Sequence, residues 1–170
     1  MYFFYDGKPL LICYGATPTA YGANPTWSDN RFTVRWMTGY VGQQPNLFNP
    51  STLQSERYWS WEERGAQTFT VHNGTVEAVT CSAATRQQGK PGDAGYIEAS
   101  GRQNGLTLKR QFQRANELGA RIVLLVSWNE WSKGEQPSLE ISKDLEPCHA
   151  FGTFYYDLMC AQIKKFKGKL

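Results

Sequence analysis

Histidine and cysteine are scarce in the chain, and neither occurs in a metal-binding pattern. The 170 residues include only two histidines, His72 and His149, and four cysteines. The cysteines do not have the short spacing of a zinc motif and the histidines are far apart in sequence, so we expect no metal site and no cofactor. We interpret both histidines as structural, and we expect buried thiols at Cys13 and Cys81, which lie in apolar runs.

Long apolar runs, a strong charge excess and phosphate-binding glycine motifs are also missing. No run approaches the ~20 apolar residues of a membrane helix. The first residues lack the basic start and small-residue cleavage site of a signal peptide. With 18 basic and 15 acidic residues, the net charge of +3 is too small to indicate nucleic-acid binding. We therefore expect neither a membrane nor a nucleic acid as partner.

Composition and length indicate one globular unit. Hydrophobic residues make up 41% of the chain and aromatic residues 14%, which argues against disorder. A chain of this length buries a sizeable core. We therefore predict a single domain over residues 1–170.

The order of segments predicts an α/β fold. Apolar runs predict strands at residues 10–14, 32–40, 66–71, 76–83 and 121–127. Helical spacing predicts helices at residues 53–64, 106–118 and 151–166. The helix at 106–118 is followed within two residues by the strand at 121–127, and this pairing is typical of a parallel sheet.

A cluster of polar and aromatic side chains follows the strand predicted at 121–127. Residues 127–135 read Ser-Trp-Asn-Glu-Trp-Ser-Lys-Gly-Glu. In α/β folds the carboxyl ends of parallel strands bind ligands. The indoles of Trp128 and Trp131 offer flat apolar faces to a sugar ring, and Asn129 and Glu130 offer hydrogen bonds to its hydroxyls. The alternative is a strand end whose indoles fill core and whose polar residues cap the next turn.

This motif, with Gly134 and the later Leu145-Glu146-Pro147, resembles the C-terminal part of glycoside hydrolase family 99, the endo-α-mannosidases, and of related WbsX-like bacterial proteins. The resemblance covers roughly residues 77–166. It implies a (β/α)8 barrel, or TIM barrel, which normally takes about 250 residues. The chain is therefore expected to be a C-terminal half-barrel with a parallel sheet. Because an open parallel sheet exposes its edges, we expect a homo-oligomer or a complementing N-terminal half.

The resemblance also implies two catalytic carboxylates on the loop after the last strand. Glu130 matches the family residue that acts on the sugar 2-hydroxyl. The acid/base position falls on Lys133, and a lysine does not readily protonate a glycosidic oxygen at neutral pH. Glu135 is the first candidate to replace it, followed by Glu140 or Glu146. Otherwise the chain binds sugar without cleaving it.

Further candidates for contact with the sugar lie outside this loop. Arg102 lies where the family has an Arg-rich loop, and Glu146 belongs to the Glu-Pro pair. One aromatic residue of the segment around Trp61 is expected to stack on a sugar ring, whereas Glu77, near the start of its strand, is expected to be structural. The predicted function is hydrolysis of a glycosidic bond in a polysaccharide. The alternative is a non-catalytic sugar-binding module or degenerate half-barrel.

Overall fold

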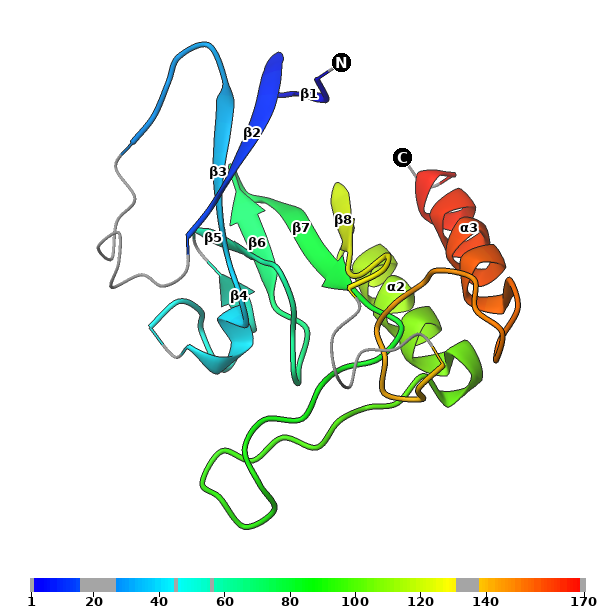
Figure 1. Ribbon diagram of the computed structural model, residues 1–170. Helices are drawn as coiled ribbons and strands as arrows, with labels where there is room; N and C mark the ends of the chain where they lie inside the picture. Colours follow the sequence, from blue (N-terminus) through cyan, green and yellow to red (C-terminus); the bar gives the residue numbers. More distant parts are fainter. Residues whose placement is uncertain (1, 16–26, 45, 56, 131–137, 169–170) are drawn as a thin grey trace.

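Two four-stranded sheets and two α-helices make up the part of the chain that the computed structural model describes, residues 2–15, 27–44, 46–55, 57–130 and 138–168 (Figure 1). The strand orders are β1-β2-β3-β5 and β4-β6-β7-β8. Both sheets contain parallel pairs. The predicted α/β class with parallel strands is therefore confirmed.

The first sheet is parallel except at its edge. Its strands are β1 (Phe4–Tyr5), β2 (Lys8–Tyr14), β3 (Thr33–Thr38) and β5 (Tyr58–Ser60). Strands β2, β3 and β5 pair in parallel, and β1 pairs antiparallel with β2. Asp6 and Gly7 join β1 to β2 with positive φ angles of 52° and 79°, as a tight hairpin turn requires.

The second sheet contains the strand that precedes the polar and aromatic segment at residues 127–135. Its strands are β4 (Gln54–Ser55), β6 (Phe69–His72), β7 (Thr75–Cys81) and β8 (Ile122–Leu125). Asn73 and Gly74, with φ angles of 49° and 74°, form the turn of the antiparallel β6–β7 hairpin. Strand β8 pairs parallel with β7, so the strand predicted at 121–127 and its direction are confirmed.

The two sheets meet where β5 lies against β7. The indole Nε1 of Trp59 donates a hydrogen bond of 2.8 Å to Glu77, and the hydroxyl of Thr80 donates to the carbonyl oxygen of Ser60. Strands β2, β3, β7 and β8 thus form one curled surface and run in the same direction (Figure 1). Their carboxyl ends therefore lie along one rim.

Both helices cover the outer side of β7 and β8. They are α2 (Leu106–Glu117) and α3 (Phe154–Lys167), which confirms the helices predicted at 106–118 and 151–166. The core beneath them contains buried residues from both helices and from β7, among them Val79, Cys81, Leu108, Phe112, Tyr155 and Phe166. Partly buried side chains of β8 pack against it. Neither helix is long and apolar enough to cross a membrane, and no other helix of the described residues is.

The inner side of the curl has a smaller core. Met37, Trp59 and Ala78 are buried there. Along β8 the side chains alternate, as the twofold period of a strand dictates: Ile122 and Leu124 face this inner core, whereas Val123 and Leu125 pack toward the helices.

The helix predicted at residues 53–64 is wrong. Strands β4 and β5 occupy this segment. All three residues of β5, Tyr58, Trp59 and Ser60, are buried between strands, a setting that favours aromatic residues in extended backbone. Within the described residues, regular alternation of strand and helix occurs only from β7 onward, as β7–α2–β8–α3.

Candidate functional site

Glu130 lies just past the carboxyl end of β8, at the rim of the curled sheet. Its main-chain N–H donates to the Asp144 carboxylate at 2.8 Å and to the Ser127 hydroxyl at 3.1 Å. Its side chain is 48% exposed. The structure therefore presents this carboxylate to solvent on a fixed backbone.

A return segment, residues 139–146, runs back beside the end of β8 and holds it. The N–H of Leu145 donates to the carbonyl of Ser127 at 3.0 Å, and the N–H of Glu146 donates to the carbonyl of Trp128 at 3.1 Å. Asp144 is fully buried in this segment, where its carboxylate also accepts a hydrogen bond from Ser142.

Lys143 connects Glu130 to a buried carboxylate, Glu62. The Lys143 Nζ lies 2.6 Å from Glu62 Oε2 and 2.8 Å from Glu130 Oε2. Glu62 and Lys143 are both buried. Both oxygens contact the same nitrogen, so the sum of these two distances is an upper limit on the distance between the oxygens. This limit falls within the ~5–5.5 Å that separates the carboxyl groups of retaining glycosidases.

Glu63 is also buried but belongs to a different set of contacts. Its carboxylate accepts hydrogen bonds from the main-chain N–H groups of Gly42 at 3.1 Å and Thr68 at 3.2 Å, and from the Thr68 hydroxyl. Burial raises the pKa of Glu63 above its ordinary value, although these hydrogen bonds oppose the shift. Glu63 thus serves the turns around it and not the rim.

An apolar hollow opens on the inner side of the curl. It has a volume of about 470 Å³ and is lined by Ile12, Tyr14, Met37, Trp61 and Leu124. Trp61 directly precedes Glu62 and meets Tyr14 edge to face, with ring centroids 6.3 Å apart. Both rings are partly exposed, at 38% and 58%. The hollow therefore offers aromatic surface on the same segment as the buried carboxylate.

The other predicted substrate-binding residues are spread over the rim. Trp128 is exposed and packs edge to face on Tyr156 of α3, with centroids 6.0 Å apart. Asn129 is exposed and Glu146 is partly exposed. Trp131, Lys133 and Glu135 lie outside the described residues.

Arg102, predicted to contact the sugar, is buried beneath the return segment. Its guanidinium donates to the carbonyl oxygens of Leu139 at 3.2 Å and Asp144 at 2.7 Å. Its carbon Cζ lies 4.1 Å from the ring centroid of Tyr155. Burial lowers the pKa of Arg102 below its ordinary value. In these contacts Arg102 supports the loop from below, at 1% exposure.

Glu62 and Lys143 are the site residues that the sequence reasoning missed. Glu62 follows β5, and a carboxylate directly after a strand is the same signal that identified Glu130. The prediction of a helix at residues 53–64 obscures this signal. Lys143 has no comparable signal, since its role depends on a contact with Glu62, 81 positions away.

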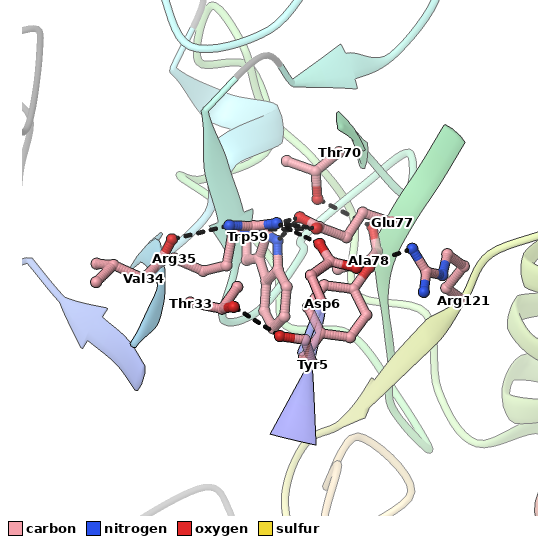
Figure 2. A network of polar contacts seen from close by, with 10 residues as sticks. All are labelled: Tyr5, Asp6, Thr33, Val34, Arg35, Trp59, Thr70, Glu77, Ala78 and Arg121. Carbon is pink, nitrogen blue, oxygen red and sulfur yellow. Dashed lines mark hydrogen bonds and ion pairs between the residues drawn. The ribbon is translucent and has the colours of Figure 1, made fainter. Parts of the chain in front are cut away.

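A second polar cluster lies at the opposite, amino-terminal end of the strands and surrounds Glu77 (Figure 2). Arg35 and Trp59 donate hydrogen bonds to this carboxylate. The two carboxylate oxygens of Asp6 each lie 3.4 Å from a guanidinium nitrogen, one of Arg35 and the other of Arg121. Burial and the nearby charge of Glu77 raise the pKa of Tyr5 to about 12. The contacts of Glu77 agree with its predicted structural role.

The described residues contain no group of three histidine, cysteine, aspartate or glutamate side chains able to hold a metal ion. Comparison of the chain with models of known protein families, with curated proteins and with solved structures found no match.

Proposed function

We propose that the protein acts on carbohydrate, as a glycoside hydrolase similar to family 99 or part of one, and cleaves glycosidic bonds in a polysaccharide. The observation that supports this most directly is the placement of Glu130. A half-exposed carboxylate stands at the carboxyl end of a parallel strand, with its N–H held by Asp144 and its side chain held by Lys143. A reacting group needs both access and a fixed position.

In this proposal Glu130 acts on a sugar hydroxyl or as a base, and aromatic side chains bind the apolar faces of the sugar rings. Trp128 at the rim and Trp61 in the apolar hollow are exposed enough to do so. Asn129 and Glu146 add hydrogen bonds to hydroxyls. The proposed second carboxylate is Glu135, two positions after Lys133 in the sequence.

The decisive experiment is a screen of polysaccharides for release of reducing sugar, comparing wild type with Glu130→Gln. Glutamine keeps the size of the side chain but removes its charge and its capacity as a base, so turnover should fall by about 10²-fold or more. Glu117→Gln is the matched control, because Glu117 lies on the exposed face of α2 and bonds only to Gln113 among the described residues. Full activity of Glu130→Gln would end the catalytic assignment.

A non-catalytic sugar-binding module is the second candidate, and one observation favours it. Lys143 forms ion pairs with both Glu62 and Glu130, and an ion-paired carboxylate accepts hydrogen bonds but supplies no proton to a leaving group. For such a module, glycan binding would occur without cleavage. Glu130→Gln would then weaken binding modestly, and Trp131→Ala would weaken it more.

We further propose that the curled sheet is the C-terminal half of a (β/α)8 barrel, completed by a second copy or by a complementing N-terminal half. Within the described residues, β8 pairs with no strand besides β7, and the outer edge of β2 pairs only with the two residues of β1. Ile12 and Tyr14 remain exposed beside that edge. Light scattering tests the second copy, because a stable monomer would exclude it.

A further inference from the structure

Glu62 is a buried carboxylate for which the proposed reaction has so far required no role. We propose that Glu62 is a positioning residue, which acts through Lys143 to hold the Glu130 carboxylate in place at the rim. Its effect on turnover rests on the proposed function, whereas the physical link between the three side chains does not.

The link consists of two short ion pairs that share one ammonium group. Glu62 Oε2 and Glu130 Oε2 lie 2.6 Å and 2.8 Å from the Lys143 Nζ. Hydrogen bonds between charged groups at such distances are stronger than those between neutral groups. The side chains of Glu62 and Lys143 are 4% and 3% exposed, against 48% for Glu130. The chain of contacts therefore runs from the interior to the surface.

Glu62 is the member that makes this arrangement stable. A buried ammonium group is costly unless its partner is buried with it, and the exposed Glu130 shares its hydrogen bonds with water. The second oxygen of Glu62, Oε1, is buried and accepts no hydrogen bond from the described residues. The ion pair with Lys143 is thus the main charge compensation that the described residues give Glu62.

The same segment also fixes the backbone of Glu130. Asp144, next to Lys143, accepts the hydrogen bond from the Glu130 N–H. One short segment therefore holds both the main chain and the carboxylate of Glu130, while Glu62 anchors that segment to the end of β5. Loss of Glu62 should release the carboxylate and leave the sheet in place.

The link is tested by NMR on protein labelled with 15N-lysine and 13C-glutamate. The wild type should show a slowly exchanging side-chain ammonium signal that disappears in Lys143→Met. Glu62→Gln should displace both this signal and the carboxyl carbon signal of Glu130. Glu63→Gln is the matched control, because it also replaces a buried carboxyl group on the neighbouring residue, yet Glu63 bonds to Gly42 and Thr68 and should leave both signals in place.

Either of two results would overturn the proposal: a wild-type spectrum without a protected Lys143 ammonium signal, or a Glu130 signal that Glu62→Gln leaves unmoved. If Glu62→Gln does not fold, Glu62→Asp keeps the charge while shortening the side chain. It should displace the Glu130 signal in the same direction.

Kinetics then separate positioning from a purely structural role. On any glycan that the wild type cleaves, Glu62→Gln should lower kcat by about 10- to 100-fold with little change in KM, because misplacing a reacting group by about 1 Å costs up to 10²-fold. The double variant Glu62→Gln/Glu130→Gln should be no slower than Glu130→Gln alone. Effects that multiply would refute positioning through Glu130. Absence of any cleavage would count against the proposed function, while the spectra still decide the link.

Discussion

Arg35 and Glu77 form a two-pronged ion pair that fastens β3 to β7, two strands of different sheets (Figure 2). The Arg35 Nε lies 2.9 Å from both carboxylate oxygens of Glu77, and Nη2 lies 2.7 Å from Oε1. Trp59 of β5 adds a hydrogen bond of 2.8 Å to Oε2. Three strands are thus joined through one carboxylate.

Removing this carboxylate should destabilise the whole fold. Glu77→Gln removes the closer counter-ion of Arg35, at a site where the Glu77 side chain is 3% exposed, and leaves the Asp6 carboxylate 3.4 Å from Nη2. Breaking a buried pair from one side costs about 3–5 kcal/mol of unfolding free energy. Urea denaturation measures this loss, and Glu117→Gln on the surface of α2 should change stability by less than about 0.5 kcal/mol. Equal unfolding free energies of Glu77→Gln and Glu117→Gln would contradict the stabilising role of the Glu77 carboxylate.

The contribution of Glu77 should vanish in acid. Burial alone would raise the pKa of Glu77, but the hydrogen bonds from Arg35 and Trp59 and the charge of Arg35 outweigh it, so the pKa is lowered. A carboxyl group with a lowered pKa in the folded state stabilises that state above its ordinary value of 4.5, and the gain is lost as the pH falls through the lowered value. The stability difference between wild type and Glu77→Gln should therefore be full at pH 7 and shrink steadily below pH 4.5. A constant difference down to pH 2.5 would argue against the ion pair.

The thiol of Cys81 should report on the core between the second sheet and the helices. Its side chain is fully buried, and burial raises its pKa to about 12. Because the thiolate is the reactive form, iodoacetamide at pH 8 should leave Cys81 unmodified in the native protein and modify it in urea. Peptide mass spectrometry reads out the site, with the half-buried Cys160 as internal comparison. Rapid native labelling of Cys81 would mean that this core opens readily.

Gly105 should be intolerant of a side chain because α3 crosses it closely. Its φ angle is +81°, and an added Cβ would lie 2.4 Å from a methyl carbon of Leu158. Gly119 has a similar φ of +67° but nothing within 4 Å. Both alanine variants bear the backbone penalty of about 1–2 kcal/mol, and only Gly105→Ala adds overpacking of about 1–3 kcal/mol. In chemical denaturation, Gly105→Ala should therefore unfold at a lower denaturant concentration than Gly119→Ala. Equal midpoints would show that α2 and α3 move apart at no cost in stability.

Local sequence patterns were enough to predict the elements on which Glu130 stands. The helix at 106–118, the short connection and the apolar run at 121–127 all reflect neighbouring residues, and the structure has them as α2 and β8. The helix predicted at residues 53–64 was wrong because aromatic residues occur in buried strands as well as in helices. Burial between two sheets decides which forms, and a local pattern does not contain that information.

The interior of the candidate site depended on contacts that no local pattern reveals. The sequence around Lys143 resembles that of an ordinary surface lysine. Its contact with Glu62 forms only in the folded chain, where Glu62 follows β5. Arg102, in turn, resembles a surface arginine available to a sugar. Its burial requires Tyr155 of α3 and the carbonyl of Asp144, both more than forty residues along the chain.

Asp6, in the turn between β1 and β2, lies 3.4 Å from Arg121, which is 115 positions further along the chain. Contacts between such distant residues form slowly, because closing the long intervening segment costs conformational entropy before any contact energy offsets it. The β6–β7 hairpin and the α2–β8 pair need only neighbouring residues and should form first. During synthesis, the β1–β2 hairpin therefore leaves the ribosome well before Arg121 does. Asp6 lacks its contact with Arg121 until that residue has emerged.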